Sequence, residues 1–179
     1  MASSAPDAAR LHEVYARVEK RIEEQYGIAV NILDVVDPNT GDFNGERIDV
    51  DYALDPEIAL FVLLHLFGHT VQWNVSAEDR ALGRDTSVGK TPEQLAKILT
   101  YERDATRYSV TLLHELGVTD LDQWLSDLWL ADWKYLEHYY TTGTKLDFRS
   151  LVRPGACACL TPLAIPHFTP HTWVSRWAF

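Results

Sequence analysis

Residues 55–74, DPEIALFVLLHLFGHTVQWN, decide the fold of this chain. Asp55 is suited to cap a helix, Pro56 to occupy its first position, and Glu57 to lie in its first turn. From Ile58 to Phe67 the segment is almost wholly apolar, and a helix that is apolar on all sides is buried. The sequence therefore predicts a buried central helix over about residues 56–74.

Two histidines, His65 and His69, lie late in this apolar segment and form an HxxxH motif. Residues at this spacing on a helix project from the same side, one turn apart. Two imidazoles so placed can bind one metal ion through nitrogens at about 2.0–2.1 Å. The alternative is a pair of core histidines, each with its own buried hydrogen-bond partner. The apolar surroundings favour one shared ion.

A third ligand is expected on the next helix. This helix starts at the capping-box spacing of residues 91–94 and ends at Gly117. Its Glu102 shares a stripe of small and apolar side chains with Ala105, Ser109 and Leu112. If that stripe packs inward, Glu102 faces the histidines. The alternative is a surface carboxylate paired with an arginine, and Asp104 is the second candidate ligand. We predict one divalent transition metal, zinc in first place and iron in second, bound by His65, His69 and Glu102.

The remaining elements follow from apolar spacing and turn residues. They are a helix over 6–26, strands over 28–36 and 46–52, a turn at 37–41, a loop over 75–90, and an aromatic-rich helix from about 119 to 143. This order predicts an α+β fold, in which a helical core carries a small antiparallel β-sheet and the metal site lies between two buried helices. We expect one metal-binding domain over residues 1–150, with the Pro-, His- and aromatic-rich tail 151–179 packed on the same domain.

Composition limits the partners. The net charge of −10 disfavours nucleic acid and anionic membranes, because both would repel such a surface. The sequence has no run of eighteen apolar residues, and its N-terminus lacks the basic start and apolar core of a secretory signal. The two cysteines fit a reducing compartment. We therefore expect a cytoplasmic protein that binds a small-molecule or peptide ligand, and the oligomeric state stays open.

Several further residues are candidates for the same site. His138, Tyr139 and Tyr140 could supply a proton donor or electrophile, although aromatic residues at helical spacing are more often core. A fourth metal ligand could come from the tail, where the candidates are Cys157, Cys159, His167 and His171. A closed set of four ligands would favour a structural site, and an open position would favour an enzyme.

Three stretches together resemble the ImmA/IrrE-type zincin-like metallopeptidases: YGIAVNILDV at 26–35, GERIDVDYALDPEIALFVLLHLFGHTVQ at 45–72 and YERDATRYSVTLL at 101–113. The resemblance spans about residues 10–117. It implies a zincin-like fold with His65, His69 and Glu102 as metal ligands. It also implies the activity of a family whose endopeptidases cleave repressors of mobile elements and stress regulons.

One position departs from the family's HExxH motif. The motif's glutamate is the general base that activates the metal-bound water, and Leu66 stands in its place. Loss of such a base slows a proton-transfer step by about 10²–10⁴-fold. We therefore expect a metal-dependent enzyme, hydrolase-like or oxygenase-like, with chemistry other than ordinary proteolysis. The alternatives are a hydrolase whose base is another residue, an inactive pseudopeptidase acting as a binding or regulatory protein, and a non-haem oxygenase with a 2-His-1-carboxylate triad.

Overall fold

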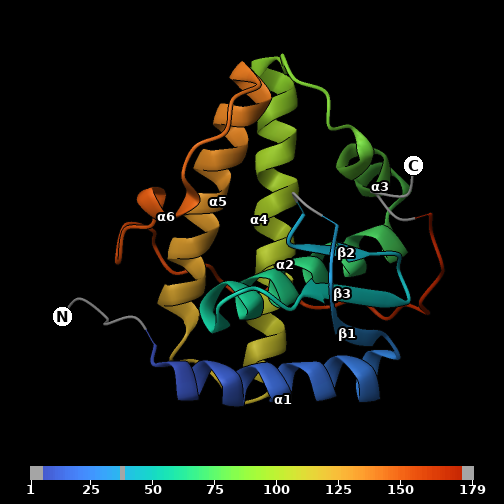
Figure 1. Cartoon of the computed structure of the whole chain (residues 1–179). Helices are drawn as coiled ribbons and strands as arrows, with labels where there is room; N and C mark the ends of the chain where they lie inside the picture. Colours follow the sequence, from blue (N-terminus) through green and yellow to red (C-terminus); the bar gives the residue numbers. More distant parts are fainter. Residues whose placement is uncertain (1–5, 37–38, 175–179) are drawn as a thin grey trace.

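The computed structural model describes residues 6–36 and 39–174, which form an α+β fold (Figure 1). Helix α2 crosses the upright pair α4 and α5, and α1 runs along the base of the molecule (Figure 1). The elements in chain order are α1 (Ala8–Tyr26), β1 (Ala29–Leu33), β2 (Gly41–Phe43), β3 (Arg47–Asp51), α2 (Pro56–Val75), α3 (Ala77–Arg84), α4 (Pro92–Glu115), α5 (Asp122–Thr142) and α6 (Phe148–Leu151).

The sheet is mixed, so the prediction of an antiparallel sheet is wrong. Its strand order is β1-β3-β2, with β1 parallel to β3 and β2 antiparallel to β3. The hairpin partner of β3 is the short strand β2, whose first residue, Gly41, fell in the predicted turn. Gly45, with a φ of 96°, reverses the chain between β2 and β3. Because β2 takes that edge of β3, β1 adds to the other edge. Residues 37 and 38 of the predicted turn lie outside the described residues.

Helix α2 is the centre of the core, as its sequence predicts. The side chain of Asp55 accepts hydrogen bonds from the backbone N–H groups of Glu57 and Ile58, which fixes the start of the helix. The helix is in contact with α1, α4 and the strands β2 and β3. Leu60, Leu63, Leu64 and Phe67 are each 0% exposed. Trp124 of α5 donates its indole N–H to Glu57, which ties the same end of the helix to α5.

By length and composition alone, α2 could cross a membrane, and it is the one helix among the described residues for which this holds. In this fold, 67% of its most apolar window is buried inside the protein. Core helices of soluble proteins have the same composition, so one such helix is weak evidence for a membrane span.

The close crossing of α2 and α4 depends on Gly68. A methyl group built at its Cα would lie 2.1 Å from the backbone oxygen of Ala105 and 2.8 Å from its Cα. Ser109 of α4 adds a hydrogen bond of 2.6 Å from its hydroxyl to the backbone oxygen of Leu64. The predicted inward stripe of α4 is confirmed, because Glu102, Ala105, Ser109 and Leu112 are all buried.

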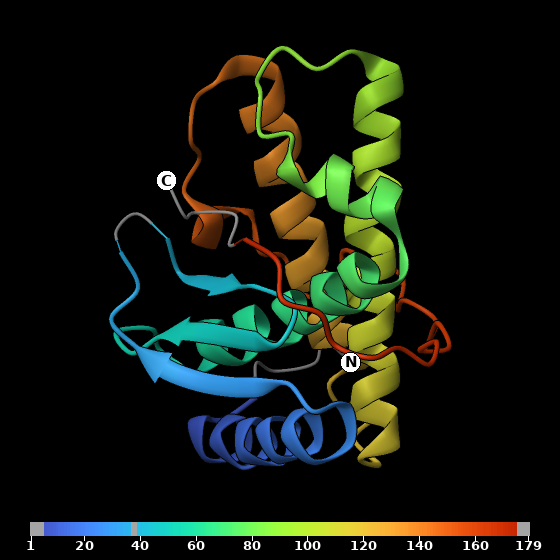
Figure 2. The same cartoon turned by 90° about the vertical axis from the view of Figure 1, so that its right-hand side faces the viewer.

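The segment after α2 differs from the predicted loop over 75–90. Its first part forms the helix α3, which starts where Ser76 accepts a hydrogen bond from the backbone N–H of Asp79. Ser76 followed by Glu78 and Asp79 is a helix-start signal that the polar composition concealed. Helix α3 lies beside α4 (Figure 2), and the two helices line a half-open cavity between them.

After α6, the chain from Val152 to Val174 forms no helix or strand and runs across the other elements (Figure 2). Backbone hydrogen bonds join Leu163 to Arg107 of α4 and Trp173 to Asn44 after β2. The N–H of His171 donates to the side chain of Asn74 on α2. The described part of the tail therefore packs on the same body as the helices.

Gly68→Ala tests the helix crossing. At an open helix position this change would raise the free energy of unfolding by about 1 kcal/mol, because alanine is the better helix former. Here we expect a loss of about 1–3 kcal/mol, because the added methyl group meets the backbone of Ala105. Urea unfolding monitored by tryptophan fluorescence measures the sign. A stabilised variant would contradict the close contact.

Candidate metal centre

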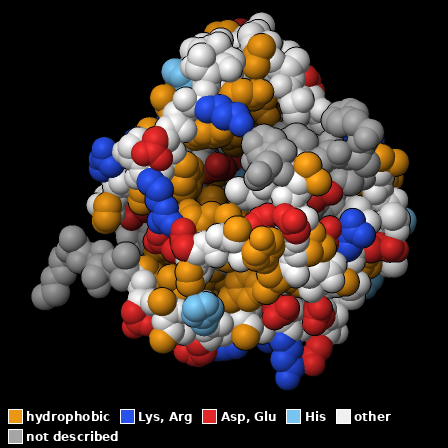
Figure 3. Space-filling model, viewed as in Figure 1, with side chains coloured by type: hydrophobic (Ala, Val, Ile, Leu, Met, Phe, Trp, Pro, Cys, Tyr) orange, Lys and Arg blue, Asp and Glu red, His pale blue; other side chains and the backbone are white. Residues whose placement is uncertain are grey.

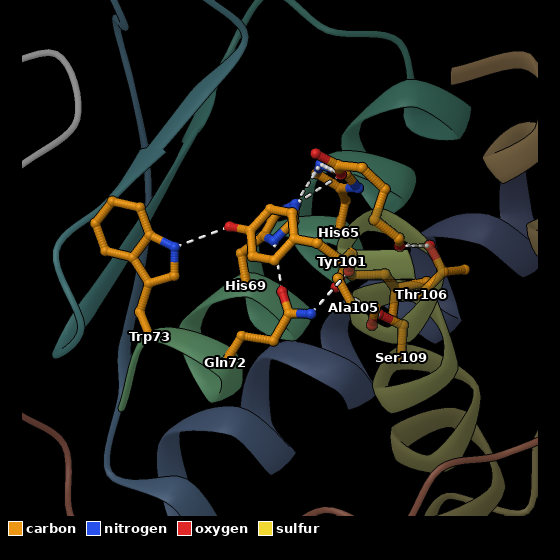
Figure 4. A network of polar contacts seen from close by, with 10 residues as sticks. His65, His69, Gln72, Trp73, Tyr101, Ala105, Thr106 and Ser109 are labelled. Carbon is orange, nitrogen blue, oxygen red and sulfur yellow. Dashed lines mark hydrogen bonds and ion pairs between the residues drawn. The ribbon is translucent and has the colours of Figure 1, made fainter. Parts of the chain in front are cut away.

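Three side chains meet where α2 crosses α4 (Figure 4). The Nε2 atoms of His65 and His69 are 3.0 Å apart. Oε2 of Glu102 lies 3.0 Å from Nε2 of His69 and 3.7 Å from Nε2 of His65. The structure therefore brings together the three residues that the sequence nominated, and this cluster could hold a metal ion.

The spacing of the three ligand atoms suits a small tetrahedral ion. Ligands about 2.0–2.1 Å from such an ion lie about 3.3 Å from one another. The distances of 3.0, 3.0 and 3.7 Å lie on either side of this value. An ion could enter with side-chain shifts of a few tenths of an ångström, and the fold would not have to change.

Gln72 fixes which nitrogen of His69 faces the cluster. Its amide N–H donates to the backbone oxygen of Tyr101 at 2.7 Å, so its amide oxygen faces Nδ1 of His69 at 2.9 Å. This contact suits a proton on Nδ1, and with the proton there the Nε2 atom of the neutral ring would present a lone pair to Glu102. Nε2 of His69 and Oε2 of Glu102 lie 3.0 Å apart, so a metal ion between them could bind both atoms.

Two aromatic rings stack against the imidazole of His69. Tyr101 stacks on it with ring centroids 4.5 Å apart, and Phe43 of β2 stacks at 6.2 Å. The hydroxyl of Tyr101 accepts a hydrogen bond of 2.8 Å from the indole N–H of Trp73. Because packing and hydrogen bonds both restrict His69, its Nε2 is aimed before any ion arrives.

The cluster is open on the side of His65. The side chain of His65 is 21% exposed, whereas those of His69 and Glu102 are 4% and 7% exposed. The molecule is hollowed in front of α4 and α5, above α2, with hydrophobic side chains around the opening and an acidic side chain at its floor (Figure 3). Phe61, one turn before His65, contributes a ring 5.7 Å from the imidazole. A ligand on this side would meet an apolar wall.

Leu66 contacts the sheet. Its Cδ1 and Cγ1 of Val62 lie 2.7 and 2.8 Å from the point where a Cβ on Gly41 would be. Gly41 therefore lets β2 lie directly on this part of α2, and Leu66 fills the contact. A leucine here offers neither an acceptor nor a charge to a metal-bound water.

The other nominated residues lie elsewhere or stay untested. Asp104 points from the next face of α4 and accepts a hydrogen bond of 3.1 Å from Arg107. His138 contacts Thr144 at the C-terminal end of α5, and Tyr140 packs there with Ile98 and Trp133. A catalytic part for His138, Tyr139 or Tyr140 therefore stays a prediction.

The tail candidates supply no fourth ligand among the residues that the structure describes. The three-residue cluster includes no cysteine and no other histidine or acid. Cys159 contacts Gln123 of α5 through its sulfur, and Cys157 donates its backbone N–H to Asp127. His167 and His171 are exposed. The set within this part of the chain is thus two histidines and one carboxylate.

Gln72 and Tyr101 were not singled out from the sequence. Gln72 lies three residues after His69, on the same side of α2, and this spacing is the signal that could have found it. Tyr101 precedes Glu102, but nothing in the sequence indicates that its ring stacks on an imidazole.

Comparison with known proteins adds no relative. No protein-family model matches the chain, and searches of curated proteins and of solved structures found no significant match. The likeness to ImmA/IrrE-type proteins therefore stays a prediction from the sequence motifs.

Gln72→Ala tests the support of His69. Without the amide oxygen the imidazole loses its fixed orientation, and we expect zinc affinity to fall about 10–100-fold. Competition against a chromogenic zinc chelator measures the change. Gln25→Ala, on the exposed side of α1, is the matched control and should leave affinity unchanged. If the Gln72 variant bound zinc as tightly as the wild type, Gln72 would not be needed to orient His69.

Proposed function

We propose that this chain is a mononuclear metalloenzyme of zincin-like design whose chemistry is not ordinary peptide hydrolysis. The observation that carries the proposal is the convergence of His65 and His69 of α2 with Glu102 of α4. Leu66 stands beside His65, where the resembling family has its general base. Zinc is the favoured metal and iron the alternative.

The number of ligands supports an enzyme over a structural site. Structural zinc sites are usually closed by four protein ligands, whereas catalytic sites have three and leave a position open. The described residues supply three, and His65 lies on the partly exposed side. When bound, a divalent metal would polarise a carbonyl oxygen or acidify a water molecule. The chain's part is to hold the ligands and to surround the open side with Phe61 and other apolar side chains.

Leu66 limits the reaction. Hydrolysis of a peptide bond requires a group that takes a proton from the attacking water and delivers one to the leaving amine. The side chain of Leu66 can do neither. Reactions that need no carboxylate base remain, including oxygen chemistry at a 2-His-1-carboxylate iron site. The apolar wall favours a small apolar molecule or the apolar side chain of a peptide as ligand.

The same leucine favours a second candidate function. A pseudopeptidase would retain the ImmA/IrrE-like arrangement and its metal and would act by binding a partner. The order of helices and strands, the HxxGH stretch on α2 and the glutamate on α4 support that kinship. A cytoplasmic location without nucleic-acid or membrane binding belongs to either proposal; the net charge of −10 disfavours nucleic acid and anionic membranes.

Elemental analysis tests the metal site directly. We expect about one metal ion per purified chain, lost in both His65→Ala and Glu102→Gln, because each change removes one of the three proposed ligands. Metal loss should also lower the melting temperature of the wild type, since an ion bound to the folded state adds stability. His12→Ala, on the exposed side of α1, is the matched control. A wild type that holds no metal after reconstitution would contradict the proposal.

Leu66→Glu tests whether the missing base is what distinguishes both candidate functions from an ordinary peptidase. If only the base is missing, the zinc-loaded variant should hydrolyse an unstructured protein such as casein, while the wild type does not. Leu66→Gln has a similar size without a basic carboxylate and is the control. Casein hydrolysis by the zinc-loaded wild type, removed by Glu102→Gln, would show that Leu66 does not prevent proteolysis.

A further inference from the structure

A cavity of about 650 Å³ lies between α3 and α4, at the C-terminal end of α2. Cavities of about 300–1,000 Å³ are typical of small-molecule sites. Helix α3 lies in front of α4 on this side of the molecule (Figure 2). The cavity shares Gln72 and Tyr101 with the support of His69, but neither histidine lines it. It is therefore a separate space behind the metal cluster.

The charges around this cavity are mainly negative. Glu78 and Asp79 of α3 and Asp104 of α4 line it, against the single cation Lys97. Burial raises the pKa of Asp79, and the nearby negative charges of Glu78 and Asp104 raise it further. The hydrogen bond from Ser76 lowers this pKa but does not cancel the rise. Asp104 is partly neutralised by Arg107, whereas Asp79 has no ion pair shorter than 4.0 Å within the described chain. A cation entering the cavity would relieve this repulsion.

The rest of the lining points to an organic cation. Tyr101 and Tyr108 offer ring surfaces, and Ala81 and Leu82 offer apolar contact. The three carboxylates do not bring oxygen atoms within 4.8 Å of one another, as the ligands of a metal ion would. Spread carboxylates with apolar and aromatic walls suit a charge that is carried on an alkyl chain.

We propose that this cavity binds a small organic cation, an amine or guanidinium on a short alkyl chain. Asp79 and Glu78 receive the charged group, and the tyrosine rings and Leu82 contact the chain. The site does not depend on the proposed metal chemistry, because none of the metal ligands lines it. A bound cation would lie against Gln72, which orients His69, so occupancy and metal binding can influence each other through that amide.

Isothermal titration with agmatine, a four-carbon guanidinium amine, tests the site at low salt. We expect saturable one-to-one binding to the wild type, with or without a chelator present. Uncharged butylurea should not bind. Asp79→Asn should weaken agmatine binding about tenfold or more, because a charge-assisted hydrogen bond is lost. The matched control is Glu24→Gln on α1, where the side chain is 69% exposed, and it should bind like the wild type.

A second variant tests whether agmatine binds in this cavity, and it changes no charge. Ala96 lines the cavity on the exposed side of α4, so the larger ring of Ala96→Phe should occupy part of it and block agmatine binding while the fold persists by circular dichroism. Binding that survives Ala96→Phe, or that falls equally in Glu24→Gln, would mean attraction to the acidic surface in general and would overturn the proposal. Absence of saturable binding to the wild type at millimolar agmatine would overturn it as well.

Discussion

The crossing of α2 over α4 is the constraint on which the rest of the structure depends. At Gly68 the two helices approach until the backbone of Ala105 occupies the place of a side chain. Glu102 lies one turn before Ala105, and His65 and His69 flank Gly68, so the same approach sets the distance between carboxylate and imidazoles. A wider crossing would leave the three polar groups in separate environments. The glycine therefore serves the site and the core together.

The sequence predicts these parts unequally. Segments with strong local signals, such as the Asp55-Pro56 helix start and the inward stripe of Glu102 and Ala105, lie as expected, because burial and capping act over a few residues. The prediction of the sheet was wrong for a non-local reason. Whether residues 29–33 pair with β3 as a hairpin or in parallel depends on which segment occupies the other edge. That segment, β2, is only three residues long and begins with a glycine. Helix α3 was missed because its polar surface resembles a loop.

The residues of the site likewise differ in how well the sequence predicts them. The histidines and the glutamate follow from helical spacing and side-chain chemistry. Their support does not, because Tyr101 and Phe43 come from different elements and meet His69 only after folding. The hydrogen bond from Gln72 to the backbone of Tyr101 likewise joins α2 to α4. Such contacts decide which nitrogen of His69 faces the cluster, and with it whether the site presents a lone pair or a proton.

The energetics of the cluster bear on whether an ion belongs there. Two imidazoles and a carboxylate, largely withdrawn from water, destabilise a core unless each finds a partner, and apolar residues of similar size would often be at least as stable. In this structure Nε2 of His69 lies 3.0 Å both from Nε2 of His65 and from Oε2 of Glu102. An ion held there would be a shared partner of all three ligands at once. Binding of an ion would offset the cost of burying them, and Leu66, which needs no partner, adds nothing to that cost. The arrangement could therefore hold an ion at a point where the core would otherwise gain little from polar residues.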